Sequence, residues 1–172
     1  MVRPNESRAR AERVPRGTRI ACVLSTYHAD VTEEMGRAAR ETLLAAGLAP
    51  RNWREVRVSG AFELPLVARA LARRADVDAV LAFGLVLRGE TDHDRHIAAA
   101  VSQGLMAAGL ETGKPILFGV LTCASIEQAR ARARRSRSGG RDKGGEVARA
   151  AIGVLEALSQ VARPRARRSA KR

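Results

Sequence analysis

Two kinds of apolar pattern alternate along the chain between residues 19 and 161. Short apolar runs predict four strands, at residues 19–25, 55–59, 79–87 and 115–121. Longer stretches with helical spacing of their apolar residues predict five helices, at residues 30–46, 64–74, 93–111, from 125 onward, and 146–161. Strands that alternate with helices in this way predict an α/β fold, with a three-layer, four-stranded parallel sheet and helices on both faces.

The positive charge of the chain is concentrated at its two ends. The formal net charge is +13 over 172 residues, of which residues 1–17 carry +3 and residues 162–172 carry +6. Such charged segments bury too little apolar surface to offset the entropy of ordering them. We therefore predict one domain at residues 18–161 between disordered basic arms at residues 1–17 and 162–172. Two roles of the arms stay open, namely solubility and weak binding of nucleic acid or another polyanion.

The sequence argues against several classes of protein. Cys22 and Cys123 lie in apolar runs without any Cys/His cluster of metal-ligand spacing, so both are expected to be buried and no metal site is predicted. There is no GxGxxG or Walker motif, which argues against hydride transfer with a dinucleotide and against ATP hydrolysis. Because no apolar stretch reaches the length of a membrane span and no secretory signal precedes the domain, a cytoplasmic protein is expected.

Polar and aromatic residues follow three of the predicted strands. Tyr27 and His28 follow the first strand, residues 60–63 follow the second, and residues 88–93 follow the third. The carboxyl ends of parallel strands meet at one edge of the sheet, where open α/β sheets bind ligands. We therefore predict a small-molecule site at this edge. Tyr27 and Phe62 could stack on a flat heterocycle there or pack into the core.

The predicted helix that starts at His93 offers two further groups. Free backbone N–H groups at a helix start can bind an anion, although an ordinary capped helix start explains the same segment. A bound phosphate would require Glu90 and Asp92 to point away or to pair with Arg88. His93 is either a base, as a neutral imidazole, or a lone surface histidine, and His96 fits the second description better.

Four segments together resemble the motifs of lumazine synthases. Residues 59–65 (SGAFELP) resemble PGAFELP, and residues 87–93 (LRGETDH) resemble (I/V)RGxTxH. Residues 118–122 (FGVLT) with residues 126–129 (IEQA) resemble FGVLT…(I/L)EQA, and residues 142–146 (DKGGE) resemble NKGxE. Because their order and spacing agree across nearly the whole domain, the chain is identified as a member of the lumazine synthase family.

The resemblance implies a flavodoxin-like fold of the lumazine synthase type and a transferase of riboflavin biosynthesis. Such an enzyme condenses 5-amino-6-(ribitylamino)uracil with 3,4-dihydroxy-2-butanone 4-phosphate to 6,7-dimethyl-8-ribityllumazine, and it releases phosphate and water. The resemblance implies no cofactor, a homo-oligomer of pentamers with active sites between subunits, and riboflavin synthase as a candidate partner. Whether the particle is a pentamer, a decamer or a capsid stays open.

The resemblance also assigns roles to individual residues. It implies that His93 transfers protons and that Tyr27 stacks on the pyrimidine. Further substrate contacts are assigned to Ala61, Phe62 and Glu63 on the ribityl chain, to Leu85, Val86 and Leu87 through their main chain, and to Phe118 and Lys143. Phosphate binding is assigned to Glu90, Thr91 and Arg132. Phe118 and Arg132 are implied to come from the adjacent subunit.

The chain departs from the family's pattern in three places. Residues 26–28 (TYH) stand where the family usually has Arg-Phe-Asn, and Ser59 replaces the proline of the motif. An Arg-rich insertion at residues 134–141 suits either a solvated loop or phosphate recognition. Since His93 and Arg132 are retained, catalysis is expected. The alternative is a binding or shell protein of the same fold with weak catalysis and polyanion-binding arms, whereas a plain nucleic-acid-binding module is disfavoured by an aromatic content of 3%.

Overall fold

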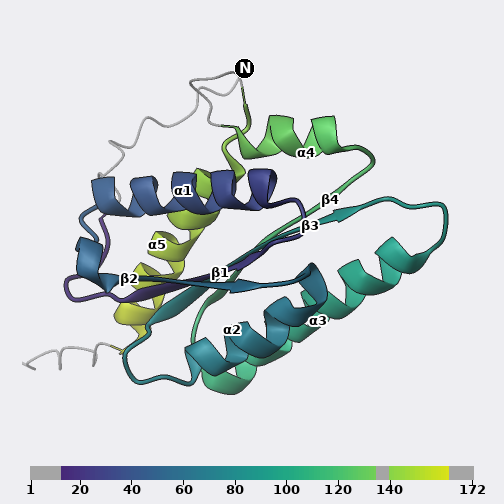
Figure 1. Cartoon of the computed structure of the whole chain (residues 1–172). Coiled ribbons are helices and arrows are strands. Elements are labelled where there is room, and N and C mark those ends of the chain that lie inside the picture. The colour runs from purple at the N-terminus through teal and green to yellow at the C-terminus, as the bar shows by residue number, and fades with distance from the viewer. Residues whose placement is uncertain (1–12, 135–139, 163–172) are drawn as a thin grey trace, which may run out of the picture.

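The apolar strand segments assemble into one sheet with the strand order β2-β1-β3-β4 (Figure 1). The computed structural model describes residues 13–134 and 140–162. Its strands are β1 (Ile20–Ser25), β2 (Trp53–Val58), β3 (Ala79–Leu87) and β4 (Ile116–Cys123). All three strand pairings are parallel, which confirms the predicted sheet.

Helices cover both faces of this sheet, so the predicted three-layer α/β fold is also confirmed (Figure 1). One face is covered by α1 (Ala29–Ala45), α4 (Ile126–Ala133) and α5 (Lys143–Ala162). The other face is covered by α2 (Leu64–Ala72) and α3 (His93–Thr112). Two short 3-10 helices, η1 (Pro50–Asn52) and η2 (Ala61–Glu63), precede and follow β2.

The start of α5 differs from the sequence-based expectation. Helical spacing predicts a helix from residue 146, whereas α5 begins at Lys143. Gly144 is buried against α1, and a Cβ atom at this position would overlap the main-chain oxygen of Met35. Glycine disfavours a helix by itself, but the two helices approach too closely here for any larger residue. The Asp142 carboxylate also caps the helix by accepting a 3.1 Å hydrogen bond from the Gly145 N–H.

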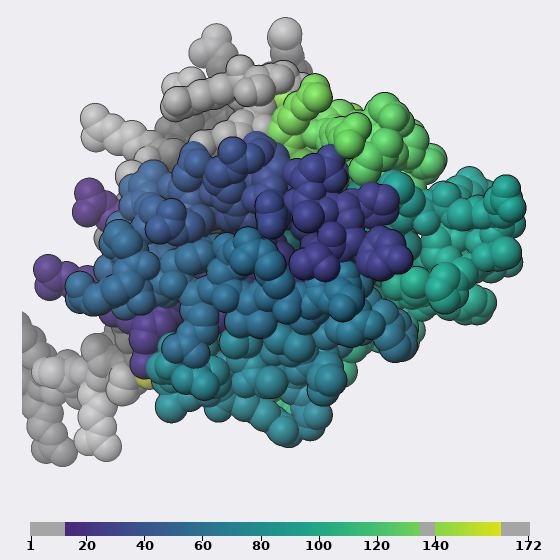
Figure 2. Space-filling model, in the orientation of Figure 1, coloured from purple at the N-terminus to yellow at the C-terminus, as the bar shows by residue number. Residues whose placement is uncertain are grey.

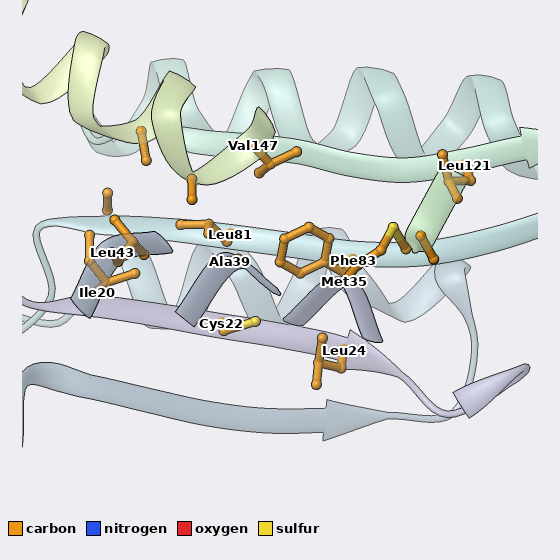
Figure 3. Close-up of a cluster of buried hydrophobic side chains, with 14 of the residues drawn as sticks. Ile20, Cys22, Leu24, Met35, Ala39, Leu43, Leu81, Phe83, Leu121 and Val147 are labelled. Carbon is orange, nitrogen blue, oxygen red and sulfur yellow. The ribbon is translucent and has the colours of Figure 1, made fainter. Parts of the chain in front are cut away.

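β3 carries the core on both of its faces. The cluster on the α1 side, shown in Figure 3, includes Ile20, Cys22, Leu24, Met35, Ala39, Leu43, Leu81, Phe83, Leu121 and Val147. Alternate strand residues meet the second cluster, which includes Leu64 and Ala68 of α2 with Val101 and Leu105 of α3. Gly119 of β4 leaves room for the Phe83 ring, which a Cβ atom there would overlap. The middle of the sheet is therefore packed on both sides.

Both cysteines are buried and free, as the sequence predicts. Burial raises the pKa of the Cys22 thiol well above its usual value, and it raises the pKa of Cys123 as well. A buried thiol with a raised pKa is a poor nucleophile. Both residues therefore act as small apolar side chains in the core.

The two edges of the sheet differ in chemistry. At the β2 edge, Arg57 pairs with Glu33 at 3.3 Å and with Glu55 at 2.8 Å, and Arg54 pairs with Asp76 at 3.1 Å. Charged side chains on an edge strand disfavour pairing with another chain. The β4 edge has no charged residue in its strand. Charged side chains therefore disfavour pairing of β2 with another chain, whereas β4 has no such charges.

The predicted arms lie almost entirely outside the described residues, which begin at Arg13 and end at Ala162. The central part of the insertion at residues 134–141 also lies outside them. Within the described part of the chain, no helix is both long and apolar enough to cross a membrane. The same residues contain no group of three or more His, Cys, Asp or Glu side chains placed to hold a metal ion.

The contact between α1 and α5 yields a matched pair of glycine substitutions. Gly144→Ala should lower the free energy of unfolding by about 2–3 kcal/mol, because the new methyl group must displace the main chain of α1. Gly153→Ala, in the same helix, meets no atom within 4 Å and should raise the free energy of unfolding by about 0.5–1 kcal/mol. Denaturant unfolding of both variants tests the difference. Equal effects of the two substitutions would contradict the close helix approach.

Candidate functional site

The turns after β1 and β2 are fastened together by their main chains. The Thr26 N–H donates to the Val58 oxygen at 2.8 Å, and the Tyr27 N–H donates to the Ser59 oxygen at 3.0 Å. The Thr26 hydroxyl adds a 3.3 Å hydrogen bond to the same Ser59 oxygen. Parallel pairing thus continues past the ends of both strands, and it holds the main chain of Tyr27 beside Gly60.

The two aromatic residues of these turns do not pack into the core. Tyr27 is 71% exposed and Phe62 is 61% exposed, so the core-packing interpretation of the sequence is wrong for both. Ala61, next to Phe62 in the chain, is buried and belongs to the cluster on the α2 side. Two aromatic rings are therefore available to a ligand at the carboxyl edge of the sheet.

The Glu63 side chain, to which the family resemblance assigns a substrate contact, closes the turn around η2. The Glu63 carboxylate accepts a 2.7 Å hydrogen bond from the Gly60 N–H. This bond joins the two ends of η2, in the manner of a capping box. Glu63 therefore shapes the Gly60–Glu63 turn, whatever further contact its second carboxylate oxygen makes.

β3 extends beyond its neighbour β1. The pairing of these strands ends at Leu24 with Phe83, whereas the pairing of β3 with β4 continues to Leu87 with Cys123. In the last part of β3, the main-chain groups that point toward β1 have no strand partner among the described residues. The side chains of Leu85 and Val86 are buried, so this stretch presents its main chain to the site.

The segment after β3 is exposed throughout and projects from the body of the molecule, at the right of Figure 1 and Figure 2. Glu90 and Thr91 lie in this loop, and His93 is the first residue of α3. The His93 ring makes no hydrogen bond or ion pair with any described residue. Asp92 pairs with Arg95 at 3.5 Å instead of with Arg88. The loop is thus open to solvent in a single chain.

Phe118 lies apart from these turns. It is 43% exposed on the free edge strand β4, where it pairs in register with Ala82. It lies five positions before the end of the strand at Cys123, which corresponds to about 16 Å along a strand. A single chain therefore does not bring Phe118 to the carboxyl edge, in keeping with the expectation that another subunit receives it.

Arg132 also belongs to the β4 side of the molecule. On α4, Arg130 donates a 2.9 Å hydrogen bond to Asp30 at the start of α1. Residues two positions apart leave a helix on different sides, so Arg132 does not face α1. Burial raises the pKa of the Cys123 thiol, and the nearby Arg132 guanidinium partly opposes this rise. Arg132 therefore lies near the end of β4.

Lys143 begins α5 on the same side of the sheet as α4. Its ammonium group donates to the Glu146 carboxylate at 2.7 Å. The segment before it is tied to α4, because the Asp142 N–H donates to the Arg134 oxygen at 2.8 Å. Lys143 is half-buried and already paired, so a ligand must compete with Glu146 for it.

These residues form two sets. The first set surrounds the carboxyl ends of β1, β2 and β3, and it contains Tyr27, Ala61, Phe62, Glu63, Leu85, Val86, Leu87, Glu90, Thr91 and His93. The second set lies on β4 and the helices that follow it, and it contains Phe118, Arg132 and Lys143. The first set can bind a flat, hydrogen-bonding ligand, and the second adds cationic groups and an exposed ring.

The comparison with known families decides between the possible chemistries. The sequence model of the 6,7-dimethyl-8-ribityllumazine synthase family matches residues 17–159, which include both sets. The chain belongs to this family. The match covers every motif on which the sequence-based identification rests.

Curated relatives support membership of the lumazine synthase family along the whole domain. The 6,7-dimethyl-8-ribityllumazine synthase of Stenotrophomonas maltophilia is 40% identical over 149 residues, which are 87% of this chain and 94% of that protein. The protein of the same name from Thermus thermophilus is 41% identical over 150 residues, which are 86% and 92% of the two chains. A solved protein of Pyrococcus horikoshii has a TM-score of 0.42 and 18% identity over 89% of this chain and 38% of that chain, a likeness too weak to indicate the fold.

Sequence analysis missed the contacts that shape the candidate site. The Glu63–Gly60 bond could have been found, since Gly60 and Glu63 have the spacing of a capping box. The Arg130–Asp30 pair spans one hundred residues and has no local signal. His28 adopts a left-handed backbone with φ 57° and ψ 51°. The presence of a histidine in a turn did not predict this conformation.

Proposed function

We propose that this chain catalyses the condensation of 5-amino-6-(ribitylamino)uracil with 3,4-dihydroxy-2-butanone 4-phosphate. The observation that carries the proposal is the first set of residues, which gathers the family's substrate motifs at one edge of the sheet in a chain of that family. Purified protein incubated with both substrates should produce the absorbance of the lumazine. Absence of that absorbance from folded, assembled protein would leave the binding or shell protein as the better description.

The pyrimidine substrate is flat and rich in polar edges. The exposed ring of Tyr27 supports stacking on its face. The main-chain groups of Leu85 and Leu87 that point away from β4 support hydrogen bonds to the ring edge, whereas Val86 lies in phase with Val80 and Arg88, whose N–H groups donate to the β4 side. Phe62 and the Gly60–Glu63 turn lie at the neighbouring strand end, within the motif that the family uses for the ribityl chain.

The chemistry requires proton transfers and the departure of a phosphate. An amine nitrogen forms a bond to a ketone carbon, whose oxygen leaves as water, and a carbon–oxygen bond to phosphate breaks. The second amine then closes the ring on the remaining carbonyl carbon, and the oxygen of that carbonyl leaves as a second water. His93 transfers these protons. Its imidazole ring is exposed and is available to the substrates, because it makes no hydrogen bond or ion pair with a described residue. The phosphate meets the loop of Glu90 and Thr91 at the start of α3. Much of the remaining rate comes from holding two substrates together.

The active site is completed by a second copy of the chain in a pentamer. Phe118 and Arg132 of one copy reach the first set of the next copy, which explains why they lie on the other side of the same chain. The unprotected β4 edge supports this arrangement. An apolar groove of about 390 Å³ beside β4, which includes Met106, Leu110 and Leu158, provides further surface for a partner copy.

The remaining expectations extend the same proposal. A protein of this pathway works in the cytoplasm, and riboflavin synthase, which consumes lumazine, is a candidate partner. Weak binding of nucleic acid or another polyanion by the basic arms follows from their net charges of +3 and +6. The arms themselves lie outside the described residues, apart from the short pieces next to the domain.

His93→Ala should lower kcat by about ten- to a thousandfold, because a general acid–base group is lost while proximity of the substrates is kept. His96→Ala is the matched control, since His96 is another exposed histidine one turn further along α3. The control should keep kcat within about twofold of the unchanged protein. Steady-state formation of lumazine measures both variants. A folded His93→Ala variant with full turnover would remove His93 from the mechanism.

Arg132→Ala should raise the KM of the phosphorylated substrate by about ten- to a hundredfold and leave the KM of the pyrimidine nearly unchanged, because one charged hydrogen bond to phosphate is lost. Arg40→Ala is the control, since Arg40 is an arginine on the exposed face of α1. Initial rates with each substrate varied in turn measure both constants. Equal weakening of the two substrates by Arg132→Ala would contradict its role at the phosphate.

Leu110→Glu should dissociate the pentamer and lower turnover together, because it places a charge in the apolar groove beside β4. Leu110 is 77% exposed in the single chain, so the substitution leaves the monomer folded. Arg40→Glu, on the exposed face of α1, should change neither property. Light scattering gives the mass of each variant. A monomer with full activity would refute the shared site.

A further inference from the structure

His28 connects β1 to α1 through an unusual backbone conformation. Its φ of 57° and ψ of 51° lie in the left-handed region, which Asn, Asp and His adopt more readily than other residues with a Cβ atom. Its carbonyl oxygen accepts hydrogen bonds from the Val31 N–H at 3.0 Å and the Thr32 N–H at 3.2 Å. The main chain at this position is therefore fixed by the helix start, and it sets the direction of the Cα–Cβ bond that carries the imidazole.

The imidazole of His28 is not used to cap the helix. No side-chain hydrogen bond joins it to the first turn of α1. The ring lies instead against Tyr27, with 6.2 Å between the ring centroids and 63° between the ring planes. This is the edge-to-face geometry that aromatic pairs prefer. Asp30, two residues further on, forms an ion pair with Arg130, so its carboxylate does not compete with Tyr27 for the imidazole.

Tyr27 depends on such a contact because little else surrounds its side chain. Its main chain is fastened to Ser59, but its side chain is 71% exposed. An exposed tyrosine ring with a fixed main chain still samples several side-chain rotamers. The His28 ring lies on one side of it and disfavours rotamers in which the two rings separate.

We propose that His28 is a positioning residue, which holds the Tyr27 ring in the orientation that receives the pyrimidine substrate. The inference rests on the proposed function for the identity of that substrate. Positioning of this kind lowers the entropy that the ring loses when the substrate binds. The contribution should equal that of one edge-to-face contact, which corresponds to about two- to tenfold in affinity.

A double-mutant cycle tests the inference in the assembled protein. His28→Asn removes the ring and keeps a residue that tolerates the left-handed backbone. It should raise both the KM and the calorimetric Kd of the pyrimidine by about two- to tenfold, with kcat and the KM of the phosphorylated substrate unchanged within about twofold. In a Tyr27→Ala background, the same substitution should have no further effect on the pyrimidine. His96→Asn is the control and should alter none of these values.

The outcomes separate the inference from the proposed function. If His28→Asn weakens the pyrimidine equally with and without Tyr27, His28 contacts the substrate itself and the positioning role is overturned. An unchanged pyrimidine KM and Kd in His28→Asn overturns it as well, while turnover by the unaltered protein still supports the proposed function. Pyrimidine binding without turnover in the unaltered protein refutes the proposed function alone, and absence of both binding and turnover refutes the two together.

Discussion

The parallel pairing of β3 on both of its sides is the constraint on which the core and the candidate site depend. Eight of its nine residues are buried, and both hydrophobic clusters pack against it. The strand is longer than β1, so the part that no longer pairs with β1 becomes the open main chain of the site. A change that tilts β3 would therefore affect stability and substrate binding together, because the same residues serve both.

The division of the site into two sets follows from the order of the strands. The ends of β2, β1 and β3 adjoin one another, whereas β4 is the free edge and carries Phe118 on its exposed side. On α4, the buried Ala129 and Ala133 face the core, which directs Arg130 toward α1 and Arg132 away from it. A chain with this topology cannot bring Phe118 to its own Tyr27 without breaking the sheet.

The sequence predicted the fold well because the apolar periodicity and the packing agree along most of the chain. The bounds of β3 matched the apolar run, and the helix predicted from residue 125 onward is capped there by Ser125, which accepts a 3.3 Å hydrogen bond from the Gln128 N–H. The start of α5 could not be predicted in this way. Glycine is required at position 144 because the main chain of Met35, which is distant in sequence, lies too close for a Cβ atom. Long-range contacts at the site, such as Arg130 with Asp30, were missed for the same reason.

The departures from the family's motifs fall in turns whose shape is held by main-chain hydrogen bonds. Ser59 contributes its carbonyl oxygen to the turn, which accepts from both the Tyr27 N–H and the Thr26 hydroxyl. Proline, the residue of the family's motif, offers the same carbonyl group, so this exchange keeps the bond to Tyr27. Thr26 adds a hydrogen bond that fastens the turn more firmly. Both departures thus preserve the position of the Tyr27 main chain, and the replacement of Asn by His28 then acts on the side chain of Tyr27 through the ring contact.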